Sequence, residues 1–128
     1  MNLFLLSAGG AIGAISRYLL GKVIMKQFPS PPFPLAMLVV NILGSLGLGL
    51  FFGIYFGGIP LGAYEDPYFL AIGIGFFGAF TTFSTFSVEA FTLLENRKLK
   101  ALFIYTSLSV AGSIITFALA YYIGLSLY

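Results

Sequence analysis

The sequence predicts an all-α membrane protein with four transmembrane helices. Of its 128 residues, 59% are apolar and only 8% are charged, and the mean hydropathy is +1.04. A soluble domain of this length could not bury so much apolar surface. Charged residues and prolines divide the chain into four apolar segments, each long enough to cross a bilayer. These segments use nearly the whole chain, so we expect a single transmembrane domain over residues 1–128.

Three loops, marked by prolines, glycines or charges, separate the four helices. The first helix ends in lysines before the proline-rich loop at 27–34, because proline cannot continue a helix interior. The loop at 57–67 combines glycines, prolines and two acidic residues, and the loop at 95–100 is basic. We therefore expect the helices, in chain order, at about residues 3–25, 35–57, 68–94 and 101–125.

The composition argues against several function classes. The chain has no cysteine or histidine, which excludes disulfides, thiol chemistry and the usual transition-metal ligands. The formal net charge of +2 is too small for nucleic-acid binding. The N-terminus lacks a basic stretch before its apolar run, so we expect no cleavable signal peptide. A hydrolytic enzyme is disfavoured because the only carboxylates are Glu65, Asp66, Glu89 and Glu95.

Small residues recur at helical spacing on the first two helices. Such stripes let helix backbones approach closely inside a membrane. They fit packing within one four-helix bundle, and they also fit a dimer that buries more of them. The first helix carries Gly9, Gly13 and Gly21, and the second carries Asn41, Ser45, Gly49, Gly53 and Gly57.

Several polar side chains fall inside the apolar segments, where they are costly and usually face a cavity or a partner. Arg17 either extends to the headgroups or lines an aqueous vestibule. Asn41 either bonds a neighbouring helix or lines a pore. The fourth helix carries four hydroxyls within one quadrant, at about 100° per residue, and this favours a polar track. They belong to Tyr105, Ser109, Ser113 and Thr116.

The stretch GIGFFGAFTTFSTFSVE, residues 73–89, places five hydroxyl residues between positions 81 and 87 of the third segment. Its glycines and β-branched threonines predict a break in the third helix near Gly78–Thr82. A broken membrane helix exposes carbonyls, which attract a cation, and N–H groups, which attract an anion. Phe83 and Phe86 share one helix face, so they either pack in the core or present their positive ring edges to an anion.

That stretch, together with GGAIGAISRYLLG (9–21) and LVVNILGSLGLG (38–49), closely resembles the Fluc (CrcB) fluoride channel family along essentially the whole chain. The resemblance implies an ion channel, not an enzyme, that exports fluoride passively and reduces its toxicity. It implies an antiparallel dimer with two pores and a structural sodium ion at the dimer interface. It also implies a multi-pass protein of the cell membrane (an inner or plasma membrane).

The resemblance assigns roles to individual residues. Arg17 corresponds to the basic residue near the vestibule, and Gly78 and Thr81 fall where backbone carbonyls hold sodium. Two positions depart from the family pattern, because Met37 and Phe117 stand where hydroxyls are common. Either change could narrow or block a pore built from this chain's own polar track. The residues that resemble the fluoride pore are Asn41, Phe83, Phe86, Ser84, Thr85, Ser109, Ser113 and Glu89.

The unequal distribution of Lys and Arg between the two ends of the helices predicts how the chain is oriented in the membrane. With four spans, the first and third loops share one side of the membrane, and the termini share the other with the second loop. Lys and Arg near span ends favour the cytoplasm, so we expect both termini outside. The second subunit is then either an inverted copy or an oppositely oriented paralogue. The first side carries Lys22, Lys26, Arg97, Lys98 and Lys100, and the second carries no Lys or Arg.

A small four-helix multidrug or cation exporter is the alternative function. Proton-coupled export needs a titratable carboxylate within the membrane, normally in the first span of that exporter family. This first span has none, and Glu89 is the only candidate in the chain. A purely structural assembly subunit is a third interpretation, but it leaves the clustered hydroxyls and phenylalanines unexplained.

Overall fold

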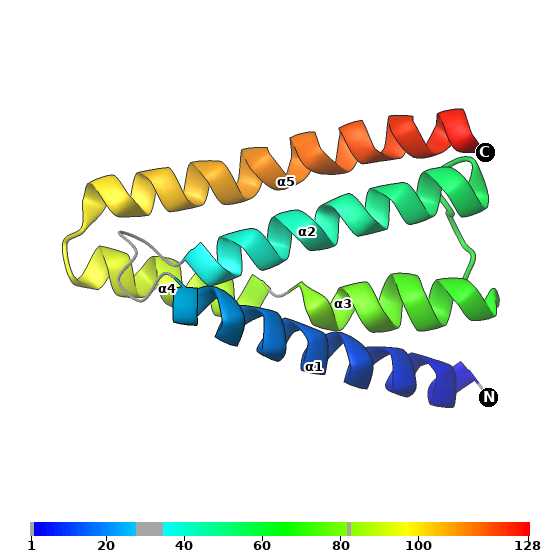
Figure 1. The fold of residues 1–128 in the computed structure, drawn as a ribbon, viewed down its shortest axis with the longest axis horizontal. Helices are drawn as coiled ribbons and strands as arrows, with labels where there is room; N and C mark the ends of the chain where they lie inside the picture. Colours follow the sequence, from blue (N-terminus) through cyan, green and yellow to red (C-terminus); the bar gives the residue numbers. More distant parts are fainter. Residues whose placement is uncertain (1, 28–34, 82) are drawn as a thin grey trace.

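The computed structural model describes residues 2–27, 35–81 and 83–128, which form helices joined by turns (Figure 1). Four helical spans in this part of the chain are long and apolar enough to cross a membrane, so the predicted all-α, multi-pass fold is confirmed. The π-helix η1 continues α2, and the π-helix η2 shares the third span with α3 and α4. The elements are α1 (Asn2–Gln27), α2 (Leu35–Phe51), η1 (Phe52–Phe56), η2 (Phe69–Phe76), α3 (Phe77–Phe80), α4 (Phe83–Glu95) and α5 (Leu99–Leu127).

The bundle contains two pairs of parallel helices. α1 packs mainly on η2 and α3, whereas α2 and η1 pack mainly on α5. The two helices of each pair run in the same direction, because the one span between them in the chain crosses the bundle in the opposite direction (Figure 1). Both termini consequently lie at the end of the bundle that also carries the loop between η1 and η2 (Figure 1).

Glycines make the close contacts within each pair. A Cβ atom on Gly13 would collide with the carbonyl oxygen of Phe76. A Cβ on Gly53 would lie 2.5 Å from the carbonyl oxygen of Tyr121, again inside van der Waals contact. The glycine stripes are thus used within one chain, as packing in a single bundle predicts. The buried glycines at these two contacts are Gly9, Gly13, Gly49 and Gly53.

Asp66 fixes the start of the third span. Its Oδ1 accepts hydrogen bonds from the backbone N–H groups of Tyr68, at 2.9 Å, and Phe69, at 3.0 Å. These N–H groups have no partner within their own helix, so the carboxylate supplies one. The hydroxyl of Tyr55 donates to Asp66 Oδ2 at 3.3 Å and ties this cap to the end of the second span.

The helical backbone of α3 ends at Thr81. The last helical residue is Phe80, Thr81 has extended angles of φ −90° and ψ 151°, and α4 begins at Phe83. The predicted break covers Gly78–Thr82, and Thr82 lies outside the described residues, so the break as a whole stays a prediction.

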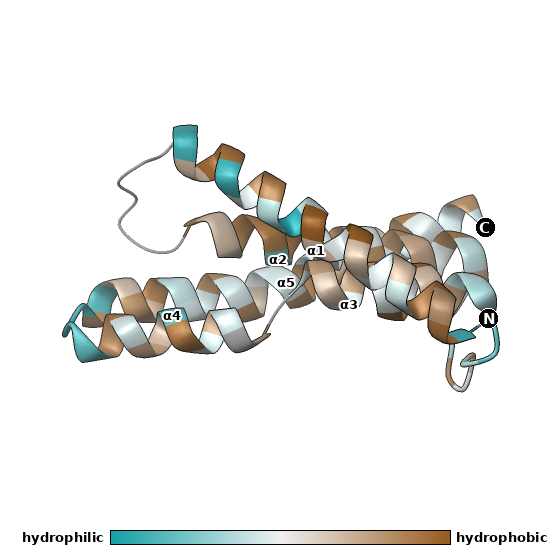
Figure 2. Cartoon of the chain, turned by 90° about the horizontal axis from the view of Figure 1, so that it is seen from below, coloured by the Kyte–Doolittle hydropathy of each residue, from teal (hydrophilic) through white to brown (hydrophobic). Residues whose placement is uncertain are grey.

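Apolar side chains cover the outer faces of the bundle. Ile15 on α1 is 59% exposed and Leu119 on α5 is 61% exposed, as expected for surfaces that face lipid rather than water. Figure 2 shows the hydrophilic colour gathered at the α4–α5 turn and at the C-terminal end of α1. These two places carry Lys22, Lys26, Arg97, Lys98 and Lys100, which were predicted to lie on one side of the membrane.

Candidate functional site

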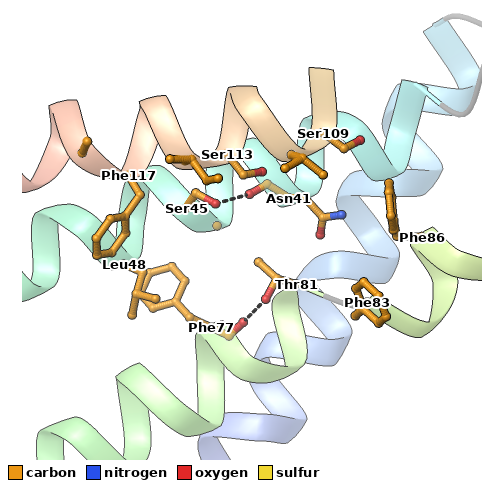
Figure 3. A pocket seen from close by; sticks show the side chains of 14 residues that line it. Asn41, Ser45, Leu48, Phe77, Thr81, Phe83, Phe86, Ser109, Ser113 and Phe117 are labelled. Carbon is orange, nitrogen blue, oxygen red and sulfur yellow. Dashed lines mark hydrogen bonds between the residues drawn. The ribbon is translucent and has the colours of Figure 1, made fainter. Parts of the chain in front are cut away.

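A cavity of about 520 Å³ lies between α2, α3, α4 and α5. Figure 3 shows side chains from all four helices directed toward this space. Most of its wall is apolar. Polar side chains line it at Asn41 and Ser45 on α2 and at Ser109 and Ser113 on α5, and aromatic rings line it at the start of α4. The lining residues are Asn41, Gly44, Ser45, Leu48, Phe77, Thr81, Phe83, Phe86, Ser109, Val110, Ser113, Ile114, Phe117 and Ala118.

The hydroxyls that line the cavity are in two different states. Ser45 Oγ donates to the carbonyl oxygen of Asn41 at 2.9 Å, and Thr81 Oγ1 donates to that of Phe77 at 2.8 Å. Both hydroxyls are therefore committed to their own helix backbone. Ser109 differs, because its side-chain oxygen is buried and finds no hydrogen-bond partner among the described residues. A buried hydroxyl without a partner is costly, so Ser109 is suited to bind a polar or charged guest in the cavity.

Phe83 and Phe86 form the aromatic wall. Their ring centroids lie 5.9 Å apart with an interplanar angle of 37°. Phe86 also packs on Tyr105, with centroids 5.3 Å apart, and so joins the buried cluster around that residue. Phe83 is 79% exposed on this chain. The shared face predicted from their spacing is therefore present, but only Phe86 is part of the core.

The apolar end of the cavity is formed by Leu48, Phe77 and Phe117 (Figure 3). The ring of Phe117 meets Phe52 edge-on at 5.9 Å and stacks on Tyr121 at 6.2 Å, with an interplanar angle of 4°. Ser109 and Ser113 lie four residues apart on α5, and the next position at this spacing is Phe117. The polar wall therefore stops before the end of the cavity.

Other predicted site residues lie outside the lining of the cavity. Glu89 accepts a hydrogen bond from the hydroxyl of Tyr105 at 3.2 Å. Thr85 is half-buried on α4, Thr116 does not line the cavity, and the side chain of Ser84 lies outside the described part of the chain.

Arg17 and Gly78 occupy positions apart from the cavity. Arg17 is half-buried on α1, and its Nε is buried without a hydrogen-bond partner among the described residues. Gly78 is exposed, and a Cβ added there would meet no atom within 4 Å. Three or more acidic, His or Cys side chains do not gather anywhere in the described part of the chain.

Sequence reasoning missed part of the apolar wall. Leu48 and Phe77 carry no sequence signal, because apolar side chains in a membrane helix face lipid, neighbours and cavities alike. Ser45 was part of the small-residue stripe of the second helix, and its spacing from Asn41 was a usable signal for a cavity-facing position.

Comparison with known proteins decides the family. A family model described as CrcB-like protein, Camphor Resistance (CrcB), matches residues 4–121. The chain belongs to the CrcB family. Among relatives of this CrcB protein, the Fluoride-specific ion channel FluC 1 of Halalkalibacterium halodurans is 58% identical over 122 residues, covering 95% of this chain and 96% of the relative.

More distant relatives of this CrcB chain carry similar names. The Fluoride-specific ion channel FluC 1 of Carboxydothermus hydrogenoformans is 43% identical over 95 residues, with 74% of this chain and 70% of the relative covered. The Fluoride-specific ion channel FluC of Erythrobacter litoralis is 40% identical over 116 residues, which cover 87% of this chain and 84% of the relative. The match of the family model, over residues 4–121, reaches all four spans.

Proposed function

We propose that this chain is a fluoride-selective ion channel that exports fluoride passively across the cell membrane. The observation that carries the proposal is the 58% identity, along nearly the full length of both chains, to a protein named as a fluoride-specific channel. The cavity fits this function, because it lies within the membrane-spanning part and combines an amide, hydroxyls and aromatic rings. The alternative, a small multidrug or cation exporter, finds no support among the relatives.

The cavity offers donors that could replace the hydration of a small anion. Fluoride is strongly hydrated, so a conducting path must supply hydrogen bonds in place of water. The amide of Asn41 and the hydroxyls of Ser109 and Ser113 line one wall and can donate. Phe83 and Phe86 line another wall, and an aromatic ring is electropositive at its edge. These groups attract an anion without a fixed positive charge that would trap it.

An antiparallel dimer with two pores is part of the proposal. The support comes from the surface of the single chain near Thr81. Gly78 is exposed there, and Phe83 presents 79% of its surface although it lines the cavity. A second subunit covering this region would bury the ring and close the open side of the cavity.

The same region fits a structural sodium ion held by backbone carbonyls of Gly78 and Thr81 from two subunits. Carbonyls at the end of a helix lack intrahelical partners, and a two-fold axis doubles their number. Because the ligands are main-chain atoms, Thr81→Ser should leave fluoride flux almost unchanged. A high-resolution density map from sodium-rich conditions that contains only water at this point would exclude the ion.

The partner subunit is either an inverted copy or an oppositely oriented paralogue. Five Lys and Arg residues lie near the ends of the first and third loops, and none lies on the other side. This asymmetry favours one orientation, with both termini outside. A C-terminal topology reporter on the chain expressed alone should give signal on one side, and equal signal on both sides would overturn the fixed orientation.

The decisive test of function is fluoride efflux from proteoliposomes that contain the purified chain. A passive channel should release fluoride when valinomycin gives potassium a path out, and it should release little chloride. An exporter of organic cations would instead need a proton gradient. Fluoride efflux no faster than from empty vesicles, at verified incorporation and with the dimer intact, would refute the channel.

A further inference from the structure

The turn between α4 and α5 contains an arginine in a backbone conformation that glycine normally occupies. Arg97 has φ +58°, and it is the only non-glycine residue with positive φ in the described part of the chain. Its N–H donates to the carbonyl oxygen of Leu94 at 3.1 Å, and the N–H of Lys98 donates to that of Leu93 at 2.9 Å. These two bonds form the Schellman motif that ends many helices.

Glycine is preferred at this position of the motif because a Cβ in the left-handed region meets the carbonyl that follows it. The turn is well anchored, since Leu93 is buried and packs in the same cluster as Leu102. A glycine at position 97 would therefore keep the turn and remove the strain. Arg97 thus places a long cationic side chain where the backbone alone would favour glycine.

The charge stands in a basic patch at the edge of the apolar surface. We use the term basic patch for Arg97, Lys98 and Lys100, all of which are exposed. Glu95 is the only acidic residue in this turn, so the patch keeps a net positive charge. The side chains next to it are apolar and also exposed, at 60% for Leu99. Figure 2 shows this turn in the hydrophilic colour at the tip of α4 and α5, whose ribbons alternate between pale and apolar colours.

We propose that the basic patch binds the headgroups of anionic phospholipids, with the guanidinium of Arg97 on the lipid phosphate. The patch sits where the apolar, lipid-facing surface ends, which is the depth of the headgroups. Clustered cations beside a membrane span attract anionic lipid. A guanidinium can also bind a phosphate with two parallel hydrogen bonds, which a lysine cannot. Neighbouring Leu99 contacts the acyl chains. The proposal does not rest on fluoride transport.

The test measures the thermal unfolding of the purified protein in nanodiscs of phosphatidylcholine alone and of phosphatidylcholine with phosphatidylglycerol. Ligand that binds only the folded protein raises its unfolding temperature. We expect phosphatidylglycerol to raise the unfolding temperature of the natural chain by about 4 °C, which for a chain of this size corresponds to a modest binding effect. Inorganic phosphate added to phosphatidylcholine nanodiscs should give no such increase.

Two substitutions at one position separate charge from strain. Arg97→Gly should raise the unfolding temperature in phosphatidylcholine, because the strain is gone, yet lose at least half of the increase caused by phosphatidylglycerol. Arg97→Gln removes the charge but keeps the strained backbone. It should therefore lose the increase caused by phosphatidylglycerol, and its unfolding temperature in phosphatidylcholine should not rise. Lys22→Gln removes one charge from α1 at the same membrane side and should keep the increase.

The opposite results would overturn the proposal. If Lys22→Gln reduces the phosphatidylglycerol effect as much as Arg97→Gln, the lipid responds to overall charge and not to the basic patch. If both Arg97 variants keep the full effect, the arginine serves insertion into the membrane only. If inorganic phosphate reproduces the effect, the site recognises free phosphate and not lipid.

Discussion

Replacing Phe117 by threonine should increase fluoride flux through this chain's own cavity. Ser109 and Ser113 line the polar wall of α5, and Phe117 follows at the next four-residue step. With Leu48 and Phe77 it makes an apolar end that offers an anion no hydrogen bond. A threonine hydroxyl would add one donor and remove the ring from the path.

The size of the effect follows from these contacts. A hydrogen bond contributes about 0.5–1.5 kcal/mol, and a barrier lowered by that amount gives roughly two- to twelvefold more flux. The ring of Phe117 makes two aromatic contacts, with Phe52 and Tyr121. Aromatic pairs contribute about 0.5–1.5 kcal/mol each, so the substitution should also cost about 1–3 kcal/mol of stability.

The assay is fluoride efflux from liposomes at equal protein content, with Phe117→Leu as the matched control. Leucine also loses the ring contacts but keeps the end of the cavity apolar, so its flux should stay near that of the natural chain. If Phe117→Thr conducts no faster than Phe117→Leu, while both remain folded, fluoride does not pass this residue and the apolar end is only packing.

The remaining predictions use the same flux assay together with thermal unfolding. Phe83→Ile should lower flux sharply, and any loss of stability should come from the contact between subunits, because the ring is 79% exposed on the single chain. Phe86→Ile changes a residue packed on the buried cluster, so it should lower both flux and the stability of the chain itself. Ser109→Ala removes a buried hydroxyl without a partner among the described residues, so flux should fall while stability is kept or rises by about 1 kcal/mol; a loss of stability would assign the hydroxyl to structure. Gly53→Ala should destabilise the fold by about 1–3 kcal/mol, since its Cβ would lie 2.5 Å from a backbone oxygen, whereas Gly58→Ala, with open space around it, should not.

The features predictable from sequence are those set by helical periodicity and by the length of a membrane span. Long apolar segments bounded by charged residues and prolines predicted the four membrane-spanning helices. Spacing alone put Ser109 and Ser113 on one face of the fourth helix and put Phe83 beside Phe86. That Asn41 shares a cavity with the two serines was implied only by the family resemblance. Such arguments work because a straight helix converts residue number directly into direction.

The features that were not predictable depend on local departures from that geometry. η1 and η2 are π-helical, and each such turn rotates the following side chains away from the directions that 3.6 residues per turn would give. The polar stripe on α5 also drifts by about 40° with every four residues. Phe117 continues that drift and lines the cavity, whereas Thr116 lies outside the lining. A hydroxyl can therefore be near the stripe in sequence and still miss the cavity.

The use of the glycines bears on how two chains could meet. A stripe of small residues in a membrane helix can serve either the bundle or a dimer, but one glycine face cannot hold two helices at once. Gly13 and Gly53 are already in contact with backbone from η2 and α5 of the same chain, so they are not available to a second subunit.

Gly78 is different, because the space around it is open. It also lies close in the chain to Phe83, whose ring lines the cavity and yet is mostly exposed. A second subunit that packs against this part of the third span would complete the wall of the cavity, whereas one that packs against the outer faces of α1 or α5 would leave it open to lipid. A conducting path for an anion cannot be open to lipid, so the proposed function and the proposed site of contact between subunits require each other.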